Sequence, residues 1–406
     1  MDAYFPADAV YWLWLQRKLG IPSSVAASVI SLDGGARRVY ESTPDELWQL
    51  GVFSVRTINA LNDRDLEMDR LTLDKCADKG ISVTVPGDIN YPRLLLTLSD
   101  PPAALFYRGD LRSAAARPCI AMVGTRNATK YGMDVAFELA DRLNRAGITV
   151  VSGVARGIDT SAHNGALKEN AGRTIAVLGC GLDYRYNLAN ETLRERMAHR
   201  SAIISEYSPG TAPLSHHFPI RNRIISGLSL GTVVIEANVK SGSLITARTA
   251  VEQNRDLFAV PTGVGTPNSS GIHKLLEEGA YPVRSPWDIL KHYHAMYPGT
   301  INLSGAERPL MYGAEPERMQ RTEPEKEKPN VTQAAMEQIA EPDCGELPEH
   351  ISEGARRMYQ YLRTAPQLAD NLAQQAQVAP DEAMMQLAEL ELYGCAQAHP
   401  GGRYSL

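Results

Sequence analysis

Apolar residues alternate with amphipathic stretches between residues 118 and 298 of this 406-residue chain. The apolar runs are as short as strands and nearly continuous, which is typical of strands buried on both faces. Six strands are expected, at residues 119–123, 148–152, 174–178, 202–205, 232–235 and 256–260. Helices are expected between them, at residues 133–146, 160–170 and 244–253. This alternation predicts an α/β fold with a parallel sheet covered on both faces.

The first 85 residues predict a small helical domain. Four apolar side chains fall on one helical face: Trp12, Trp14, Leu15 and Leu19. Pro44 follows Ser42-Thr43 as a capped helix start, and Gly51 separates that helix from another near residues 54–61. Helix–turn–helix units can touch a DNA backbone, but these turns lack basic residues, which favours a packing module.

Three further segments complete the chain. Residues 86–117 form a connector rich in proline, aspartate and glycine, and we group them with the α/β core as one domain, residues 86–300. Residues 301–347 are charged and broken by proline, so a flexible linker is expected. Residues 348–406 predict three short helices followed by two strands, the pattern of a winged-helix domain. The third helix carries Asp381 and Glu382 but no lysine or arginine, which argues against DNA reading.

Composition narrows the classes of protein that fit. The five cysteines contain no CxxC pair, so neither a zinc module nor a disulfide framework is indicated, and a reducing cytoplasm is expected. No signal peptide is read at the N-terminus, and no apolar run approaches the ~18 residues of a membrane span. The chain carries a net charge of −6, yet residues 118–298 hold 19 Lys/Arg against 15 Asp/Glu. The middle is therefore mildly basic between acidic flanks.

Turns that could hold phosphate groups follow the first, second and fifth predicted strands. Such turns lie at the carboxyl ends of parallel strands, where backbone N–H groups and helix N-termini face an anion. Their candidate phosphate-cradling residues are Gly124, Thr125, Ser152, Gly153, Gly157, Ser241, Gly242, Ser243 and Thr246. Each turn also has a purely structural interpretation, as a tight turn or a helix cap.

The segment from His217 to Arg223 contains planar donors and an aromatic ring. Arg221, Asn222 and Arg223 can donate to phosphate oxygens or base edges, and Phe218 can stack on a base. The alternative is that Phe218 belongs to the core and one arginine forms an internal ion pair. We expect at least one of the two arginines to face a ligand.

Enzymatic interpretations are less well supported. The first turn lacks the GxGxxG pattern, which argues against a dinucleotide cofactor. Ser152, Asp159 and His163 lack the GxSxG context of a catalytic triad. Glu236 could serve as a base in sugar chemistry, but no second acid accompanies it. No catalytic residue, metal or cofactor is expected.

Several motifs, in this order, resemble the DNA-processing protein A family, also called DprA or Smf. They are Val123-Gly124-Thr125-Arg126, the run from Ser152 to Asp159 with Ala162-His163, Val177 to Asp183, Ser205-Glu206-Tyr207, Phe218 to Ser229, and Glu236-Ala237 with the run from Ser241 to Arg248. The flanks also match, since the family has a helical N-terminal domain of the sterile-alpha-motif type and a winged-helix tail. The resemblance covers nearly the whole chain apart from the linker.

The resemblance implies an extended Rossmann-like domain that binds single-stranded DNA, forms a homodimer and loads the recombinase RecA on incoming strands in natural transformation. By motif match, the DNA groove would include Arg126, His217, Phe218, Arg221, Arg223 and Lys240. Three places depart from the family pattern: Tyr186-Asn187, Pro261-Thr262 and His273. The last two leave a phosphate role for the final loop of the core in doubt.

A second hypothesis is a nucleotide-hydrolysing enzyme, because related Rossmann folds include phosphoribohydrolases. Those enzymes carry a PGGxGT-type loop near a glutamate, and the sequence contains no such loop. A non-catalytic binder of single strands remains the favoured interpretation.

Overall fold

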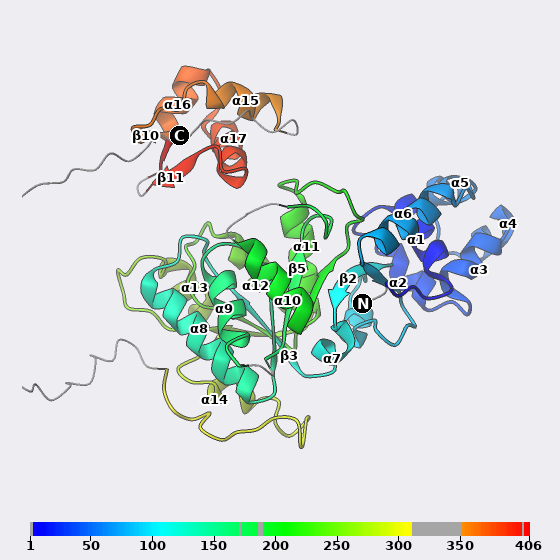
Figure 1. The fold of residues 1–406 in the computed structure, drawn as a ribbon, viewed down its shortest axis with the longest axis horizontal. Coiled ribbons are helices and arrows are strands. Elements are labelled where there is room, and N and C mark those ends of the chain that lie inside the picture. Colours follow the sequence, from blue (N-terminus) through cyan, green and yellow to red (C-terminus); the bar gives the residue numbers. More distant parts are fainter. Residues whose placement is uncertain (1–2, 170–171, 186–189, 311–350, 400–401) are drawn as a thin grey trace, which may run out of the picture. The chain divides into compact units, whose positions relative to one another are not determined.

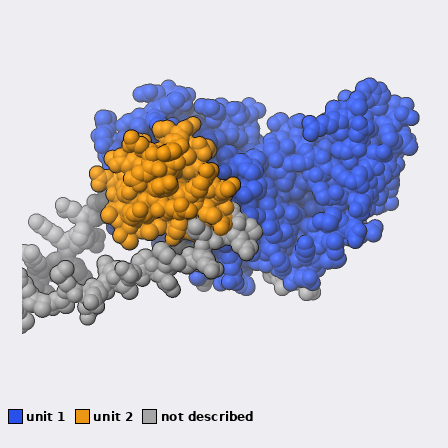
Figure 2. Space-filling view, turned by 90° about the horizontal axis from the view of Figure 1, so that it is seen from above, with its two compact units in different colours: residues 1–312 blue, residues 313–406 orange. Residues whose placement is uncertain are grey.

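The computed structural model describes residues 3–169, 172–185, 190–310, 351–399 and 402–406. The chain divides into two compact units, residues 1–312 and residues 313–406 (Figures 1 and 2). The first unit includes the predicted N-terminal helical domain and the α/β core. Most of the predicted linker, residues 311–347, lies outside the described residues. No helix of the described residues is long and apolar enough to cross a membrane.

The α/β core is built on a nine-stranded sheet with the order β1-β2-β6-β5-β4-β3-β7-β8-β9. Strands β3 to β9 are parallel, while β1 and β2 form an antiparallel edge beside β6. The strands are β1 Ser82–Thr84, β2 Leu105–Gly109, β3 Cys119–Val123, β4 Thr149–Ser152, β5 Thr174–Leu178, β6 Ala202–Ser205, β7 Gly231–Val234, β8 Asp256–Ala259 and β9 Tyr281–Pro282. The α/β prediction is confirmed, and the six predicted strands correspond to β3 through β8.

The strand order reverses between β3 and β7. The chain passes from β3 to β6 in one direction and then returns to place β7 on the other side of β3. At such a reversal the connecting loops diverge and leave a crevice at the carboxyl ends of the strands, where ligands of open α/β sheets bind. The loops after β3 and β7 therefore mark the place to look for a site.

Helices cover both faces of the sheet (Figure 1). One apolar layer joins α8 and α9 to the sheet, and another joins η1, α7, α11, α12 and α13 to its opposite face. The helices of this region are η1 Arg93–Thr97, α7 Leu111–Ala115, α8 Lys130–Arg145, α9 Ile158–Ala166, α10 Glu191–Arg200, α11 His217–Gly227, α12 Gly242–Glu252, α13 Ser270–Glu277 and α14 Trp287–Leu290. Burial on both faces explains why the strands read as continuous apolar runs.

The N-terminal helices share a core with one end of this sheet. Buried Trp12 and Leu15 belong to the same apolar cluster as Phe106 of β2 and Leu178 of β5. The helices are α1 Ala9–Leu19, α2 Val25–Ile30, α3 Gly35–Glu41, α4 Pro44–Gln49, α5 Val55–Leu61 and α6 Glu67–Asp78. Thr43 caps α4 in a reciprocal capping box with Glu46, which matches the capped helix start predicted there.

The C-terminal unit has the predicted three helices and two-stranded wing. It contains α15 Glu353–Tyr359, α16 Ala369–Ala376, α17 Pro380–Leu392, and a small sheet of β10 Gln367–Leu368, β11 Gln397–His399 and β12 Arg403–Ser405. Met384 and Met385 of α17 are exposed next to Asp381 and Glu382. The third helix thus presents an acidic and apolar face without cations.

The linker was predicted to begin at residue 301, but residues 301–310 pack on the α/β core. Ala306 and Leu310 are buried in the core of the α/β region. Arg142 of α8 donates to the carbonyl oxygens of Gly305, Arg308 and Pro309, and the Leu310 amide donates to the Arg284 carbonyl oxygen. Because these contacts fix the segment on the core, the packed part of the first unit extends to Leu310.

Candidate nucleic-acid interface

Helix α11 carries the segment from His217 to Arg223 and begins at the carboxyl edge of the sheet. No helix was predicted for these residues from the sequence. In a helix, side chains three or four positions apart share a face, so the donors of this segment point in different directions. Phe218 and Asn222 are half-buried, whereas His217, Arg221 and Arg223 are buried.

Two exposed cations lie in loops at the carboxyl edge of the sheet. Arg126, in the loop after β3, lies with its guanidinium carbon 5.7 Å from the centre of the Phe218 ring. Lys240, in the loop after β7, is also exposed. Within the described part of the chain, no carboxylate forms an ion pair with either of them. Their charge is therefore available to an anion at this edge.

Arg221 is a buried structural residue at the carboxyl edge of the sheet. Its guanidinium donates to the Gly153 carbonyl oxygen at 2.9 Å and to the Val177 carbonyl oxygen, and lies 5.8 Å from the Phe218 ring centre. A Cβ on Gly153 would come within 2.8 Å of the guanidinium, so only glycine permits this approach. Arg221 is 5 % exposed and ties the ends of β4 and β5 to α11. This burial contradicts a direct contact between Arg221 and a ligand in this conformation.

Arg223 forms an internal ion pair, which contradicts the expectation that it lines a groove. Its Nη2 lies 2.6 Å from both carboxylate oxygens of Glu206, and its Nε lies 3.4 Å from Asp100. The side chains of Arg223 and Glu206 are 6 % and 4 % exposed. Burial raises the pKa of the Glu206 carboxyl, although the Arg223 charge opposes this shift. Arg223 therefore fastens α11 to the loop after β6.

The His217 side chain is buried against neighbouring residues and does not face a ligand. Its ring stacks on the Tyr207 ring with 4.0 Å between centres, and its Nδ1 lies 3.2 Å from the Gly179 carbonyl oxygen. Burial lowers the pKa of the His217 imidazole, and the neighbouring His216 lowers it further. At neutral pH His217 is therefore an uncharged side chain that orders the first turn of α11.

The cradle expected after β3 is filled by the protein itself. Glu236, 1 % exposed, accepts hydrogen bonds at the start of α8 from the Thr129 amide at 2.9 Å and from the Thr129 hydroxyl. The Thr125 amide donates to the Glu236 carbonyl oxygen at 2.8 Å, and a Cβ on Gly124 would meet Ile158 at 2.5 Å. A carboxylate thus takes the helix end where a phosphate would sit, and Gly124 and Thr125 have structural roles.

The cradle expected after β4 is filled in the same way. The Asp159 carboxylate accepts from the amides of Gly153 at 3.1 Å and Ala155 at 3.3 Å, and the Ser152 hydroxyl donates to the Met122 carbonyl oxygen at 2.6 Å. Burial raises the pKa of the Asp159 carboxyl against the opposing effect of Arg221. Gly157 adopts φ +83°, and a Cβ there would lie 2.5 Å from the Thr125 carbonyl oxygen. Ser152, Gly153 and Gly157 therefore shape the loops and offer no free N–H cradle.

The third cradle, at the start of α12, differs from the other two. Among the described residues, no side chain caps this helix end; the hydroxyls of Ser241 and Ser243 instead contact each other at 2.8 Å. Gly242 is exposed, whereas Thr246 points into the core at 1 % exposure. The free N-terminus of this eleven-residue helix lies directly after Lys240, so it can attract an anion.

Comparison with known proteins identifies the family. The model of the family described as DNA recombination-mediator protein A matches residues 82–294, and the model of the DprA winged helix domain matches residues 343–402. The chain belongs to the DNA-processing protein A family. It is 34% identical over 407 residues to the protein Smf of Synechocystis sp., a match that covers 98% of both chains. It is 42% identical over 231 residues to the DNA processing protein DprA of Streptococcus pneumoniae, covering 57% of this chain and 80% of that protein.

A solved structure agrees with this assignment. The X-ray structure of DNA processing protein A from Streptococcus pneumoniae superposes with a TM-score of 0.60 at 36% identity. The match covers 70% of this chain and 97% of that one. The resemblance found in the sequence is thus confirmed, together with the fold class it implied.

In this member of the DNA-processing protein A family, the residues considered for a triad do not assemble into one. His163 Nδ1 contacts the Thr174 hydroxyl at 2.7 Å, while the Ser152 hydroxyl and Asp159 carboxylate have the other partners described above. Burial lowers the pKa of His163 to about 3, so the ring is neutral. Among the described residues, no group of three His, Cys, Asp or Glu side chains could hold a metal ion.

One exposed cation at this edge was not predicted from the sequence, and several residues that were predicted to contact DNA are buried. Arg156, in the loop after β4, is exposed, and its guanidinium donates to the Asn127 side-chain oxygen at 2.5 Å beside Arg126. Arg156 was not among the residues expected from the sequence to contact DNA. Its place in a glycine-rich loop after a buried strand was the available signal, since that loop had to emerge at the carboxyl edge.

Proposed function

We propose that this chain binds single-stranded DNA along the carboxyl edge of its sheet without acting as an enzyme. The observation that carries the proposal is that exposed Arg126, Arg156 and Lys240 lie on loops of the same edge as the open start of α12, with Arg126 over the half-buried Phe218 ring. Cations and a helix N-terminus attract phosphates, and an aromatic ring stacks on bases without regard to sequence. Family membership supports the same conclusion.

The direct contacts that we propose are made by Arg126, Arg156, Phe218, Asn222, Lys240, Ser241 and Gly242. His217, Arg221, Arg223 and Ser243 would hold this surface in shape from inside. Two carboxylates occupy the other cradles, which argues against a phosphoribohydrolase, because Glu236 is committed to capping α8 and cannot also serve as a base.

Binding would be tested with a fluorescently labelled oligo(dT) strand and with a duplex of equal length. We expect the single strand to bind more tightly, because the edge has no helix shaped for a major groove. Affinity should fall with added salt, with a logarithmic slope of about −0.7 for each phosphate contacted. Equal affinity for the duplex would refute the proposal, and release of free base from nucleoside monophosphates would refute its non-catalytic part.

We further propose that the protein acts in the cytoplasm as a homodimer that loads the recombinase RecA during natural transformation. This part rests on the family resemblance. The physical support concerns affinity. One surface with three exposed cations offers limited affinity, whereas two linked surfaces on one strand gain affinity through effective concentration. Sedimentation at micromolar concentration tests the dimer. RecA filament assembly on strands coated with single-strand-binding protein tests the loading, and a monomer that stimulated assembly fully would refute the coupling between them.

A further inference from the structure

Gln16 of α1 reaches from the N-terminal helices into the α/β core. Its side chain is buried, at 8 % exposure, and both ends of its amide are bonded. The Nε2 donates to the Glu206 carbonyl oxygen at 2.9 Å, and the Oε1 accepts from the Ala104 amide at 2.9 Å. A buried glutamine with both groups satisfied by backbone 88 and 190 residues away is a specific link, not incidental packing.

The two bonded backbone groups lie where β2 and β6 separate. The register pairs Phe106 with Ser205, so Ala104 and Glu206 are just outside the last pair of this antiparallel ladder. The Gln16 amide bonds to both of them and so bridges the two chain segments at the point where the ladder ends. Without it, a donor and an acceptor would be buried unpaired, and the path of the chain after β6 would lose its support.

The chain after β6 in turn fixes the beginning of α11. The Glu206 carboxylate holds Arg223, and the ring of the next residue, Tyr207, stacks on His217, the first residue of α11. Phe218 follows immediately. A displacement of residues 206–207 would therefore reach the aromatic side chain of the proposed DNA surface through two separate contacts.

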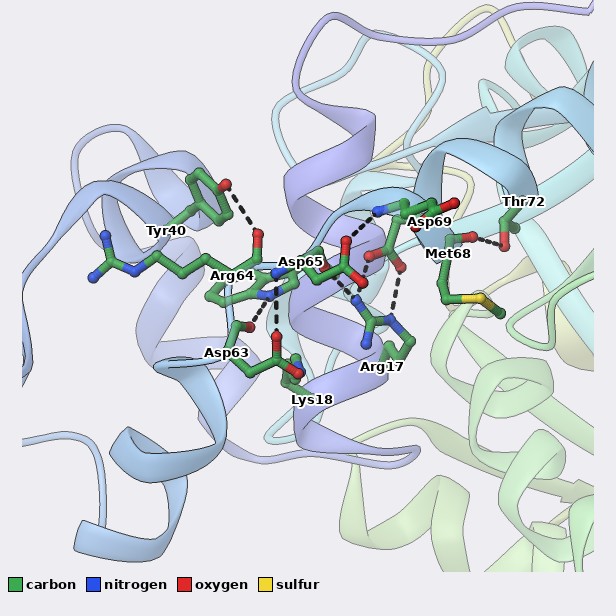
Figure 3. Close-up of polar contacts among 11 residues, drawn as sticks. Arg17, Lys18, Tyr40, Asp63, Arg64, Asp65, Met68, Asp69 and Thr72 are labelled. Atoms are coloured by element: carbon green, nitrogen blue, oxygen red, sulfur yellow. Dashed lines mark hydrogen bonds and ion pairs between the residues drawn. The ribbon is translucent and has the colours of Figure 1, made fainter.

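Helix α1 is anchored to the other N-terminal helices, so a displacement of these helices would also move Gln16 (Figure 3). Arg17 donates to both carboxylate oxygens of Asp69 on α6, at 3.1 and 2.7 Å, and to the Asp65 carbonyl oxygen. Lys18 pairs with Asp63, whose carbonyl oxygen accepts from the Trp14 indole at 2.9 Å. The residues on both sides of Gln16 thus anchor α1 to the other N-terminal helices.

We propose that Gln16 is a positioning residue for the DNA-facing end of α11, through which the N-terminal helices regulate affinity for single-stranded DNA. The inference rests on the proposed function of the carboxyl edge. It assigns the N-terminal helices a role in binding although none of their residues lies on the surface that meets the strand.

The test compares Gln16→Leu and Gln16→Glu with a control at the same boundary, Lys79→Met. Lys79 of the segment after α6 pairs with Asp183 of the core and does not touch Glu206. Gln16→Glu keeps an acceptor for the Ala104 amide but loses the donor to Glu206, so it isolates the link toward α11. We expect both Gln16 variants to bind oligo(dT) about tenfold more weakly, the effect of about 1.4 kcal/mol. Lys79→Met should bind within twofold of the wild type.

A second readout does not depend on DNA. The His217 imidazole would be followed by NMR in the full chain, its signal assigned by its loss in His217→Gln. In the wild type the pKa of His217 is lowered by burial, with His216, Tyr207 and the carbonyl oxygens of Gly179 and Ala212 around it. In the Gln16 variants it should move up toward the ordinary value, because Tyr207 no longer covers the ring, and it should stay in place in Lys79→Met.

These measurements separate the possible outcomes. Wild-type affinity in both Gln16 variants would overturn the inference, and so would weakened binding with an unmoved His217 signal, since the loss would then arise by another route. A lower thermal midpoint alone would reduce Gln16 to packing. If the wild type failed to bind single strands, the proposed function would fall, whereas the His217 signal would still report whether Gln16 positions α11.

Discussion

Arg126 covers one face of the Phe218 ring, with its guanidinium carbon 5.7 Å from the ring centre. The two residues come from the loop after β3 and the first turn of α11, 92 positions apart in the sequence. A base that stacks on Phe218 must therefore displace the guanidinium or stack on it. Under the proposed function, Arg126 and Phe218 would therefore contact neighbouring parts of the same strand.

Arg126→Ala should weaken oligo(dT) binding by about 1 kcal/mol, roughly fivefold, and flatten the logarithmic salt slope by about 0.7. Its thermal midpoint should stay at the wild-type value, because Arg126 is exposed. Arg38→Ala, which removes an exposed cation from α3, is the matched control and should change neither quantity. An unchanged salt slope in Arg126→Ala would remove this residue from the interface.

Phe218→Leu should cost about 1–3 kcal/mol of binding free energy, since it keeps the apolar bulk and removes the stacking face. The salt slope should remain that of the wild type, because no cation is lost. Anisotropy titrations at three salt concentrations measure both effects. A changed slope with little change in affinity would mean that the ring serves only to place Arg126.

Arg223→Met should lower the free energy of unfolding by about 3–5 kcal/mol, because it leaves the buried Glu206 carboxylate without its partner. The sequence alone left open whether one arginine forms an internal ion pair, and the burial of Arg223 against Glu206 decides this for Arg223. Replacing Glu206 with Leu in the same molecule should restore a large part of the loss. Urea unfolding provides the measurement, and a fully stable single variant would show that the ion pair does not matter for folding.

Stability should decline in mild acid because of His163. An unfolded histidine has a pKa of about 6.5, whereas burial lowers the pKa of folded His163 to about 3. Below pH 6.5 the unfolded chain binds a proton at His163, whereas the folded chain binds it only near pH 3. The stability present above pH 6.5 is therefore lost progressively toward pH 3, by up to about 1.4 kcal/mol per pH unit. Unfolding of the wild type and of His163→Asn at pH 7, 6 and 5 isolates this contribution. Parallel pH profiles of the two proteins would contradict it.

A fragment of residues 1–310 should fold and bind oligo(dT) like the full chain, because its core is complete and α17 offers no cation. A fragment of residues 1–303 removes Leu310, which is 2 % exposed, and should lose at least about 2 kcal/mol of stability. Urea unfolding and binding of both fragments test this. A large loss of affinity in the longer fragment would transfer the DNA site to the C-terminal unit.

The strands of the α/β core could be predicted closely because burial on both faces leaves a simple apolar signal. The predicted ranges 119–123, 174–178 and 202–205 are those of β3, β5 and β6. The antiparallel strand β2 and the two-residue edge strand β9 were not predicted, since neither is bounded by the same pattern. Their place in the sheet depends on partners far away in sequence, such as β6 for β2.

The site was predicted less well, and helix geometry and internal carboxylates explain the difference. The sequence showed the loops that reach the carboxyl edge, but it could not show that Asp159 and Glu236 fill two of them. It showed two arginines in α11, but not that Gly153 and Glu206 would be their partners. Contacts between residues far apart in the sequence decide whether a polar group binds another part of the protein or faces solvent. A single sequence does not show these contacts.

Glu236 has a consequence for selectivity among anions. A free nucleotide brings one phosphate group to a fold of this type and gains most from a strong anchor at a helix end, and this carboxylate already occupies the helix end at the start of α8. A strand gains instead from many weak anchors along the edge. Under the proposed function, the glutamate that stabilises α8 would therefore favour binding of a polymer over binding of its monomers, and millimolar nucleotide pools should compete poorly for the proposed DNA surface.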